Sequence, residues 1–300
     1  MNLNEPKVSV VIASKVGPPF IDNCLSSLEN QKNAPDFEVI VVDCHGDKTQ
    51  DLIHTKYPWV HLIPRESLRA IPDLRREGVE HARGEIIAIL EEHCTACEEW
   101  LEIIARAHEE PYAAVGGSVL DYNYDRLRDW TTYFVEYNAY MPPVLTGEAN
   151  DLPMNNIAFK RDVLKKYLAD LGHGYWEAFL FSKLSSDKAA LLSEPRMIVY
   201  HHGPFNYLYY LRQRYLFSRA YAGAHRSVMP QSRRVLYVLL SPMLPALLLG
   251  RIGLRVWAKK CHVNKFLQCL PMLLPVSVSY IAGEFTGYLF GAGDSLQQVE

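Results

Sequence analysis

Apolar residues in the first 120 positions alternate between two spacings. Short β-branched runs, which predict buried strands, occupy residues 8–13, 38–43, 59–63, 86–90 and 113–119. Apolar residues at helical spacing predict helices over residues 20–31, 49–57, 72–82 and 97–107. Strands that alternate with helices in this way are typical of a parallel sheet with helices on both faces. The predicted fold class is therefore α/β.

The pattern changes twice after residue 120. Residues 121–195 are mixed, with helices predicted over residues 162–168 and 176–185 and a short strand leading to His201. Two uncharged apolar runs follow, of 16 residues (235–250) and 18 residues (266–283), and each contains two prolines. We therefore predict an α/β domain over residues 1–203 and a mostly helical region over residues 204–300.

The charge is distributed unevenly along the chain. The 300 residues carry a formal net charge of −3. Residues 195–283 hold 12 Lys/Arg and no Asp or Glu, whereas residues 1–194 hold 19 Lys/Arg and 31 Asp/Glu. Basic asymmetry of this kind indicates nucleic acid or anionic lipid as a partner. The apolar runs inside the basic stretch favour membrane lipid and argue against nucleic acid.

The membrane topology of the two runs follows from their length and flanks. A hydrocarbon core of ~30 Å needs about 20 apolar residues, so both runs are short. Basic residues precede the first run and link it to the second, and positive flanks prefer the cytoplasmic side. A re-entrant or interfacial hairpin keeps both basic segments there; a two-span hairpin and the buried helices of a soluble domain are the alternatives. We expect the cytoplasmic face of a membrane, in bacteria the inner membrane.

The cysteines and the N-terminus agree with a reducing compartment. Six cysteines in 300 residues, at positions 24, 44, 94, 97, 261 and 269, do not resemble a disulfide framework. The first apolar run has only six residues, which is too short for a signal peptide. The predicted α/β domain is therefore expected to keep free thiols in the cytosol.

Candidate chemistry lies where predicted strands end, because ligands of such sheets bind at the carboxyl ends of the strands. Asp43 ends the second strand, and Glu91, Glu92 and His93 follow the fourth. Glu91 and His93 are two residues apart, so in extended chain they share a face. A carboxylate and an imidazole there suit a divalent metal that holds a diphosphate. A solvated charged loop is the alternative, and His93-Cys94-x-x-Cys97 is a weak match to a zinc knuckle.

Three further features have both a functional and a structural interpretation. Arg75 and Arg76 could contact a phosphate or form a solvated helix face. Glu177 opens a helix beside aromatic residues; it could be a general base or a glutamate favoured by the helix dipole. The adjacent His201 and His202 could supply a metal ligand or be structural.

The order of these motifs resembles family 2 glycosyltransferases over residues 7–226. The segments that carry the resemblance are V-S-V-V-I-A, C-L-x-S-L-x-x-Q, F-E-V-I-V-V-D, L-R-R-E-G-V-x-x-A-R-G-E-I-I-A-I-L-E-E-H-C, G-G-S-V (116–119), N-N-I-A-F-K-R (155–161), G-Y-W-E (174–177) and the Arg-rich residues 213–219. The resemblance implies a nucleotide-sugar-binding GT-A fold. It also implies inverting transfer of a sugar from a nucleotide-diphosphate donor, usually with Mg²⁺ or Mn²⁺.

The same resemblance implies roles for individual residues. Asp43 matches the family's nucleotide-binding Asp, and Glu91 and His93 stand where the family has D-x-D. Glu177 stands where the acceptor-activating acid is found, and His202 or His201 is near the place of a further metal or phosphate ligand. The metal ligands expected are His93 and His202, and the donor-binding residues are Asp43, Arg75 and Glu91.

Two departures from the family pattern bear on mechanism. A histidine in place of an aspartate suits Mn²⁺ better than Mg²⁺. Trp176-Glu177 replaces the family's Glu-Asp pair, so one carboxylate must serve as base. The Q-x-x-R-W signature of processive synthases is absent from residues 213–217, which favours single transfers.

The predicted function is inverting transfer of one sugar to a lipid-linked or membrane-proximal saccharide hydroxyl. Two rival classes remain. One is a catalytically weak or inactive membrane-associated scaffold of the same fold. The other is a nucleotidyltransferase, which needs a Gly/Lys-rich loop after the first strand; residues 14–19 are only faintly like one.

Overall fold

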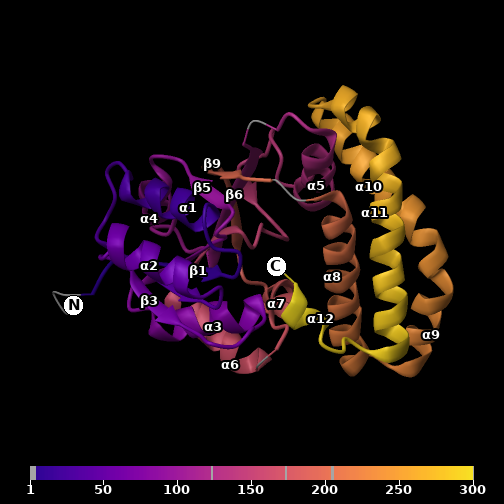
Figure 1. The fold of residues 1–300 in the computed structure, drawn as a ribbon, viewed down its shortest axis with the longest axis horizontal. Coiled ribbons are helices and arrows are strands. Elements are labelled where there is room, and N and C mark those ends of the chain that lie inside the picture. Colours follow the sequence, from indigo (N-terminus) through magenta and orange to yellow (C-terminus); the bar gives the residue numbers. More distant parts are fainter. Residues whose placement is uncertain (1–4, 123, 173, 204–205, 300) are drawn as a thin grey trace. The chain divides into compact units, whose positions relative to one another are not determined.

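The computed structural model describes residues 5–122, 124–172, 174–203 and 206–299, which form two compact units (Figure 1). The first unit comprises Met1–Tyr122 and Tyr140–His202, and the second comprises Asn123–Ala139 and Gly203–Glu300. A segment from the middle of the chain thus packs with the C-terminal residues. The division at residue 203 remains a prediction about domain organisation.

The first unit is built on one sheet. Its strands, among the described residues, are β1 (Val8–Ser14), β2 (Phe37–Asp43), β3 (His61–Pro64), β4 (Ile86–Leu90), β5 (Cys94–Ala96), β6 (Ala114–Asp121), β7 (Gly147–Glu148), β8 (Asn156–Lys160) and β9 (Leu191–His201). The strand order is β3-β2-β1-β4-β8-β6-β9-β5, and β7 pairs with β9. The α/β class is confirmed.

The sheet is mixed, which corrects the prediction of a parallel sheet. Strands β1 to β4 are parallel, but β8 runs antiparallel to both β4 and β6, and β5 runs antiparallel to β9. All seven residues of β1 and all five of β4 are buried. Their β-branched runs are therefore the easiest to recognise, because strands buried on both faces read as continuous apolar runs.

Helices of the first unit lie close to their predicted positions. They are α1 (Phe20–Glu29), α2 (Asp47–Lys56), α3 (Ile71–His81), α4 (Trp100–Ala107), α6 (Arg161–Leu171) and α7 (Glu177–Ser186). Helix α4 begins three residues later than predicted, because residues 98 and 99 form a turn between β5 and the helix.

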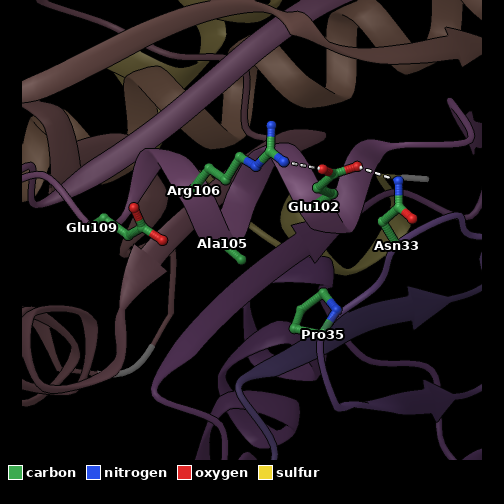
Figure 2. A pocket seen from close by; sticks show the side chains of 6 residues that line it. All are labelled: Asn33, Pro35, Glu102, Ala105, Arg106 and Glu109. Carbon is green, nitrogen blue, oxygen red and sulfur yellow. Dashed lines mark hydrogen bonds and ion pairs between the residues drawn. The ribbon is translucent and has the colours of Figure 1, made fainter.

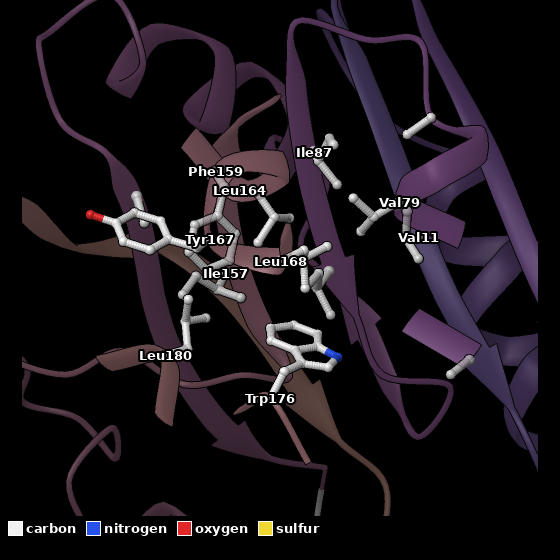
Figure 3. Close-up of a cluster of buried hydrophobic side chains, with 14 of the residues drawn as sticks. Val11, Val79, Ile87, Ile157, Phe159, Leu164, Tyr167, Leu168, Trp176 and Leu180 are labelled. Carbon is white, nitrogen blue, oxygen red and sulfur yellow. The ribbon is translucent and has the colours of Figure 1, made fainter. Parts of the chain in front are cut away.

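Helices α3, α6 and α7 share a buried cluster with β1, β4 and β8 (Figure 3). The cluster includes Val11, Ile87, Phe159, Leu168 and Trp176. The Trp176 indole Nε1 donates a hydrogen bond to the Pro72 carbonyl at 2.8 Å. This bond fastens the first turn of α7 to the first turn of α3. Glu177 of α7 and Arg75 of α3 are thereby brought together.

The second unit is helical. Its elements are α5 (Leu127–Tyr137), α8 (Tyr207–Val228), α9 (Gln231–Leu240), the 3-10 turn η1 (Ser241–Met243), α10 (Leu244–Lys259), α11 (Val263–Phe290) and α12 (Ser295–Gln298). Helices α8 and α11 run side by side (Figure 1). A Cβ on Gly287 would lie 2.6 Å from the Arg219 carbonyl oxygen, and one on Gly283 would collide with Ser218. The two glycines, one turn apart on α11, therefore permit the close approach of α8.

We predict that Gly287→Ala and Gly250→Ala change stability in opposite directions. A methyl at position 287 overpacks the α8–α11 contact, which costs about 1–3 kcal/mol. Gly250 has open space where its Cβ would be, so alanine there gains up to about 1 kcal/mol from reduced freedom of the unfolded chain. Thermal melting in detergent measures both variants. A melting temperature of Gly287→Ala at or above that of Gly250→Ala would contradict the packing assigned to α11.

Two helical segments of the second unit are long and apolar enough to cross a membrane. They are Gln231–Lys259, with 29 residues, and Val263–Phe290, with 28. At 1.5 Å per residue the shorter extends about 42 Å, more than the ~30 Å of a hydrocarbon core. Pro271 and Pro275 lie inside α11 without ending it. Both runs are at the short end for a span when only their uncharged residues are counted, but the helices extend beyond those residues and are long enough by length and composition.

Several basic side chains of the C-terminal stretch have partners from residues 123–139. Arg214 Nη2 lies 3.3 Å from Glu136 Oε1. Arg255 donates to the Asn138 side-chain oxygen at 3.0 Å, and Lys259 donates to the Ala139 carbonyl at 3.1 Å. Residues 195–283 contain no acid, but Arg214 has an acidic partner outside this stretch. Its partner comes from α5, which the sequence places about 80 residues earlier.

Candidate active site

The carboxyl ends of β1 and β2 lie side by side, since Ser14 pairs with Asp43. Asp43 is fully buried. Its Oδ1 accepts a hydrogen bond from the His45 backbone N–H at 3.3 Å, and its Oδ2 accepts one from Gly46 at 3.0 Å. The carboxylate therefore fixes the turn after β2. A contact between Asp43 and a nucleoside remains a prediction. Each carboxylate oxygen has a further lone pair that could accept a hydrogen bond from the nucleoside.

Glu91 and His93 lie together after β4. The distance from His93 Nδ1 to Glu91 Oε1 is 3.8 Å, and the His93 ring is 3% exposed and packs against Phe20. Burial opposes ionisation of Glu91, but His93, His201 and Arg75 outweigh it and lower its pKa to about 2. Glu91 is therefore a carboxylate at neutral pH.

Glu92, between them, has a different role that the sequence analysis missed. Its carboxylate is 2% exposed and accepts hydrogen bonds from the backbone N–H groups of Lys15, Val16 and Gly17 at 2.8, 2.9 and 3.0 Å. The Ser14 hydroxyl donates a fourth at 3.1 Å. Residues 91–94 form a turn, in which the Cys94 N–H donates to the Glu91 carbonyl at 2.9 Å. The extended chain expected for E-E-H is therefore not observed, and the turn is what separates the three side chains.

Arg75 and Glu177 form an ion pair. Arg75 Nη1 donates to Glu177 Oε1 at 2.7 Å, and the two side chains are 8% and 12% exposed. Burial disfavours the guanidinium charge, but Glu177 and Glu91 outweigh it and raise the pKa of Arg75. The Arg75 Nε–H is buried and has no hydrogen-bond partner among the described residues. An anionic group bound beside Glu177 would satisfy this donor.

Arg76, by contrast, is structural. Its guanidinium donates to the Leu168 carbonyl at 2.7 Å and to the Gly172 carbonyl. It therefore joins α3 to the C-terminus of α6. Neither of the predicted alternatives, a phosphate contact or a solvated face, describes this buried arginine.

The two adjacent histidines face different surroundings. His201, in β9, is buried, and its ring centroid lies 6.2 Å from that of His93. The His202 ring stacks on Tyr122 at 3.8 Å and lies within hydrogen-bonding distance of Thr95 Oγ1, at 3.2 Å. Burial lowers the pKa of His201 to about 3 and that of His202 to about 4. Both are neutral at pH 7, which is the form that binds metals.

The donor set can be tested against a divalent metal. Among the described residues, no three His, Cys, Asp or Glu side chains gather as a metal-binding group. Glu91 and His93 supply two donors. Such a pair fits a metal that takes its remaining ligands from substrate phosphates and water.

The zinc knuckle is not supported by the cysteine environments. Cys94 Sγ lies 3.5 Å from Asn155 Nδ2, whereas Cys97 Sγ donates to the Arg196 carbonyl at 3.7 Å. Burial raises the pKa of both thiols, which opposes the thiolate form that zinc requires. Within the part of the chain that the structure describes, no four-ligand group forms around them.

A surface pocket lies elsewhere on the first unit (Figure 2). Its lining comes from the segment before β2 and from helix α4 and its end: Asn33, Pro35, Glu102, Ala105, Arg106 and Glu109. Glu102 is already engaged by Arg106 at 2.6 Å and by Asn33 at 3.1 Å. None of the predicted site residues lines this pocket. The candidate site is therefore defined by the contacts between its side chains and not by this pocket.

The sequence matches the model of glycosyl transferase family 2 over residues 9–168, just over half of the chain. The chain belongs to this family. Its fold is the GT-A fold.

Two solved structures show the same fold. The mannosyltransferase PcManGT from Pyrobaculum calidifontis, in complex with GDP-Man and Mn²⁺, superposes with a TM-score of 0.56 at 17% identity. That match covers 96% of this chain and 88% of PcManGT. Residues 1–349 of S. aureus TarS superpose with a TM-score of 0.53 at 15% identity, covering 93% and 90%.

Curated relatives include polypeptide N-acetylgalactosaminyltransferase 12 from two mammals. The Mus musculus protein is 30% identical over 148 residues and the Homo sapiens protein 30% over 153. Each match covers 47% of this chain, which spans about a quarter of the length of these relatives. The likeness is thus confined to part of each protein.

Proposed function

We propose that this chain transfers a single sugar, with inversion, from a nucleotide-diphosphate sugar to a hydroxyl of a membrane-proximal or lipid-linked acceptor. The observation that carries the proposal is the buried Arg75–Glu177 pair beside Glu91. The pair consists of a carboxylate, which can accept a proton, and a guanidinium whose buried Nε–H has no hydrogen-bond partner among the described residues. Proton removal from the acceptor and charge neutralisation of the leaving diphosphate need these two groups.

In the proposed mechanism Glu177 accepts the proton of the acceptor hydroxyl while that oxygen bonds to the anomeric carbon. The bond from this carbon to the diphosphate oxygen breaks in the same step, and the nucleoside diphosphate leaves with the electron pair. Arg75 holds Glu177 in place through its Nη1 and offers its Nε–H to the diphosphate. A base positioned in this way contributes about 10²–10⁴-fold to the rate. Attack opposite the leaving group inverts the anomeric configuration.

The remaining residues hold the donor. Asp43 contacts the nucleoside, and Glu91 with His93 would hold a divalent metal. Bound metal supplies neutralising charge to the leaving diphosphate. The imidazole nitrogen favours Mn²⁺ over Mg²⁺. His201 is the nearer of the two later histidines to His93, whereas the His202 ring is engaged by Tyr122 and Thr95.

Nucleoside diphosphate release from a panel of nucleotide sugars tests this proposal. The purified protein is assayed with Mn²⁺, with Mg²⁺ and with chelator. We expect slow release from one donor class, lost with chelator and restored better by Mn²⁺. Nucleotide binding without release from any donor, even with candidate acceptors added, would instead favour the scaffold.

Glu92 disfavours the nucleotidyltransferase alternative. That class binds phosphate through the loop after its first strand. Here the three successive N–H groups of residues 15–17, which would form such an anion-binding nest, are already donated to the Glu92 carboxylate. These three N–H groups are therefore not available to a phosphate.

The acceptor proposal depends on the second unit. Helix α9 has no buried residue among those described, and large apolar side chains are exposed along α9, α10 and α11. Arg233, Arg251 and Lys260 are exposed among them. This combination fits an anionic lipid surface, which attracts each nearby basic residue by about 1 kcal/mol. We propose membrane binding from the cytoplasmic side.

We predict that a cysteine replacing Ala258, in the basic link, is labelled only from the cytoplasmic side. Serine replaces Cys44, Cys97 and Cys261, the partly exposed cysteines. A membrane-impermeant maleimide is applied to intact cells and to inverted vesicles. Labelling in intact cells would establish two spans with the link outside and contradict the re-entrant placement. Full recovery of the protein without detergent would contradict membrane binding itself.

A further inference from the structure

We infer that Glu92 is a positioning residue that holds the loop after β1 in the conformation that binds the donor. The inference rests on the proposed function, because it assigns Glu92 an effect on donor affinity. Glu92 lies between Glu91 and His93 in sequence, yet its carboxylate is directed to a different loop. Its four accepted hydrogen bonds all come from residues 14–17.

The Glu92 carboxylate accepts the hydrogen bonds of the backbone N–H groups of residues 15–17. Residues 15–17 follow β1 and precede α1, so they lie outside both the sheet and that helix. Buried N–H groups without acceptors are costly, and a carboxylate accepts several of them strongly. Glu92 Oε1 takes two of these groups and Oε2 takes the third together with the Ser14 hydroxyl. The loop conformation therefore depends on one side chain that comes from the end of β4.

The far side of the same loop contacts the turn that Asp43 fixes. Gly17 has a φ of +74°, and a Cβ there would lie 2.6 Å from His45 Nδ1 and 2.7 Å from Thr49 Oγ1. His45 Nδ1 lies 3.1 Å from Thr49 Oγ1, and the His45 N–H is one of the two that Asp43 accepts. The Cys44 N–H donates to the Ser14 carbonyl at 3.0 Å.

These contacts connect Glu92 to Asp43 through two adjoining loops. Glu92 holds residues 14–17, which pack against His45 and Thr49, and His45 belongs to the turn around Asp43. A change at Glu92 is therefore expected to move the nucleoside-binding edge while leaving Arg75 and Glu177 in place. Donor affinity should fall, and the chemical step should be spared.

The test compares Glu92→Gln with wild type in two measurements. Hydrogen exchange of the peptide covering residues 14–17 reports the loop directly and needs no catalytic activity. We expect its amides to exchange at least about tenfold faster, since the glutamine NH₂ group cannot accept their hydrogen bonds. Steady-state kinetics should show the donor KM raised about tenfold with kcat within about twofold, the size expected from one or two lost charge-assisted bonds.

Two further variants make the test specific. Gly17→Ala disturbs the loop from its far side without touching the carboxylate, and it should reproduce the rise in donor KM even where Glu92→Gln folds poorly. Glu98→Gln makes the same chemical change in an exposed ion pair with Lys32, and both measurements should stay at wild-type values.

The outcomes are separable. Unchanged exchange in folded Glu92→Gln would overturn the loop-holding role. Faster exchange with an unchanged donor KM, in Glu92→Gln and Gly17→Ala alike, would overturn the effect on donor binding. A fall in kcat with donor KM unchanged would place Glu92 in the chemical step, which also overturns it. If wild type releases nucleotide from no sugar donor, the proposed function fails, and hydrogen exchange still decides whether Glu92 holds the loop.

Discussion

Glu177→Gln is expected to bind donor with normal affinity and to lose transfer by about 10²-fold or more, the usual contribution of a positioned base. The amide cannot accept the acceptor's proton. Its oxygen can still accept the bond from Arg75 Nη1, which glutamate accepts at 2.7 Å. Donor affinity by calorimetry and initial transfer rates measure the two effects separately.

Glutamine is preferred to alanine at position 177 for a physical reason. Both substitutions remove the negative charge opposite Arg75, but glutamine keeps an oxygen that accepts the Arg75 hydrogen bond and fills the same volume. Alanine would also leave a buried donor without its acceptor, at a further cost of about 1–3 kcal/mol. The matched control is Glu80→Gln, an exposed glutamate on α3, which should transfer at the wild-type rate. Near-normal turnover in Glu177→Gln would remove this residue from the mechanism.

His93→Ala is expected to weaken metal-dependent donor binding at least tenfold, roughly the smallest loss for a metal ligand, since supporting residues alone give about 10–100-fold. Cys97→Ser should have little effect, because the sulfur donates only a weak bond to the Arg196 carbonyl. Donor affinity is measured with Mn²⁺ and with chelator for each variant. His93 also packs against Phe20, so the relevant quantity is the difference between the two conditions.

The two variants together distinguish a donor-bound metal from zinc. A zinc knuckle would need both residues, whereas a metal that holds the diphosphate needs only His93. Equal losses in His93→Ala and Cys97→Ser, with stoichiometric zinc in the purified wild type, would favour the knuckle again.

Much of the fold could be predicted because its central strands are buried on both faces. The runs of β1, β2 and β4 are almost entirely apolar, so their positions follow from the sequence. Strand β8 could not be recognised in the same way. It begins with Asn156, a buried polar residue whose hydrogen bonds go to Trp100, Ser118 and Met197, which are all far from it in the sequence. The antiparallel part of the sheet depends on such long-range partners.

The candidate site was predictable at the level of strand ends and helix starts. Asp43 ends β2 and Glu91 follows β4, as the sequence predicts, and Glu177 begins α7. The pairing of Arg75 with Glu177 was not predictable, because the two residues are 102 positions apart and meet through the packing of α3 and α7. The structural role of Arg76 was hidden for the same reason, since its acceptors lie at the end of α6.

The C-terminal region shows where local reasoning was insufficient. A charge count within residues 195–283 finds no acid that could pair with the basic residues there. Glu136, on α5, supplies one. Likewise, counting uncharged residues underestimated helices that include their basic ends, such as the one that ends at Lys259. Both differences arise because helix packing and helix length are properties of longer segments than the runs themselves.

The most direct test of the proposed mechanism is the anomeric configuration of the first product, measured by proton NMR during turnover of an α-linked nucleotide sugar. A single displacement with Glu177 as base predicts a β-linked product, formed by wild type and lost in Glu177→Gln. An α-linked product would contradict the mechanism, because retention cannot arise from one attack opposite the leaving diphosphate.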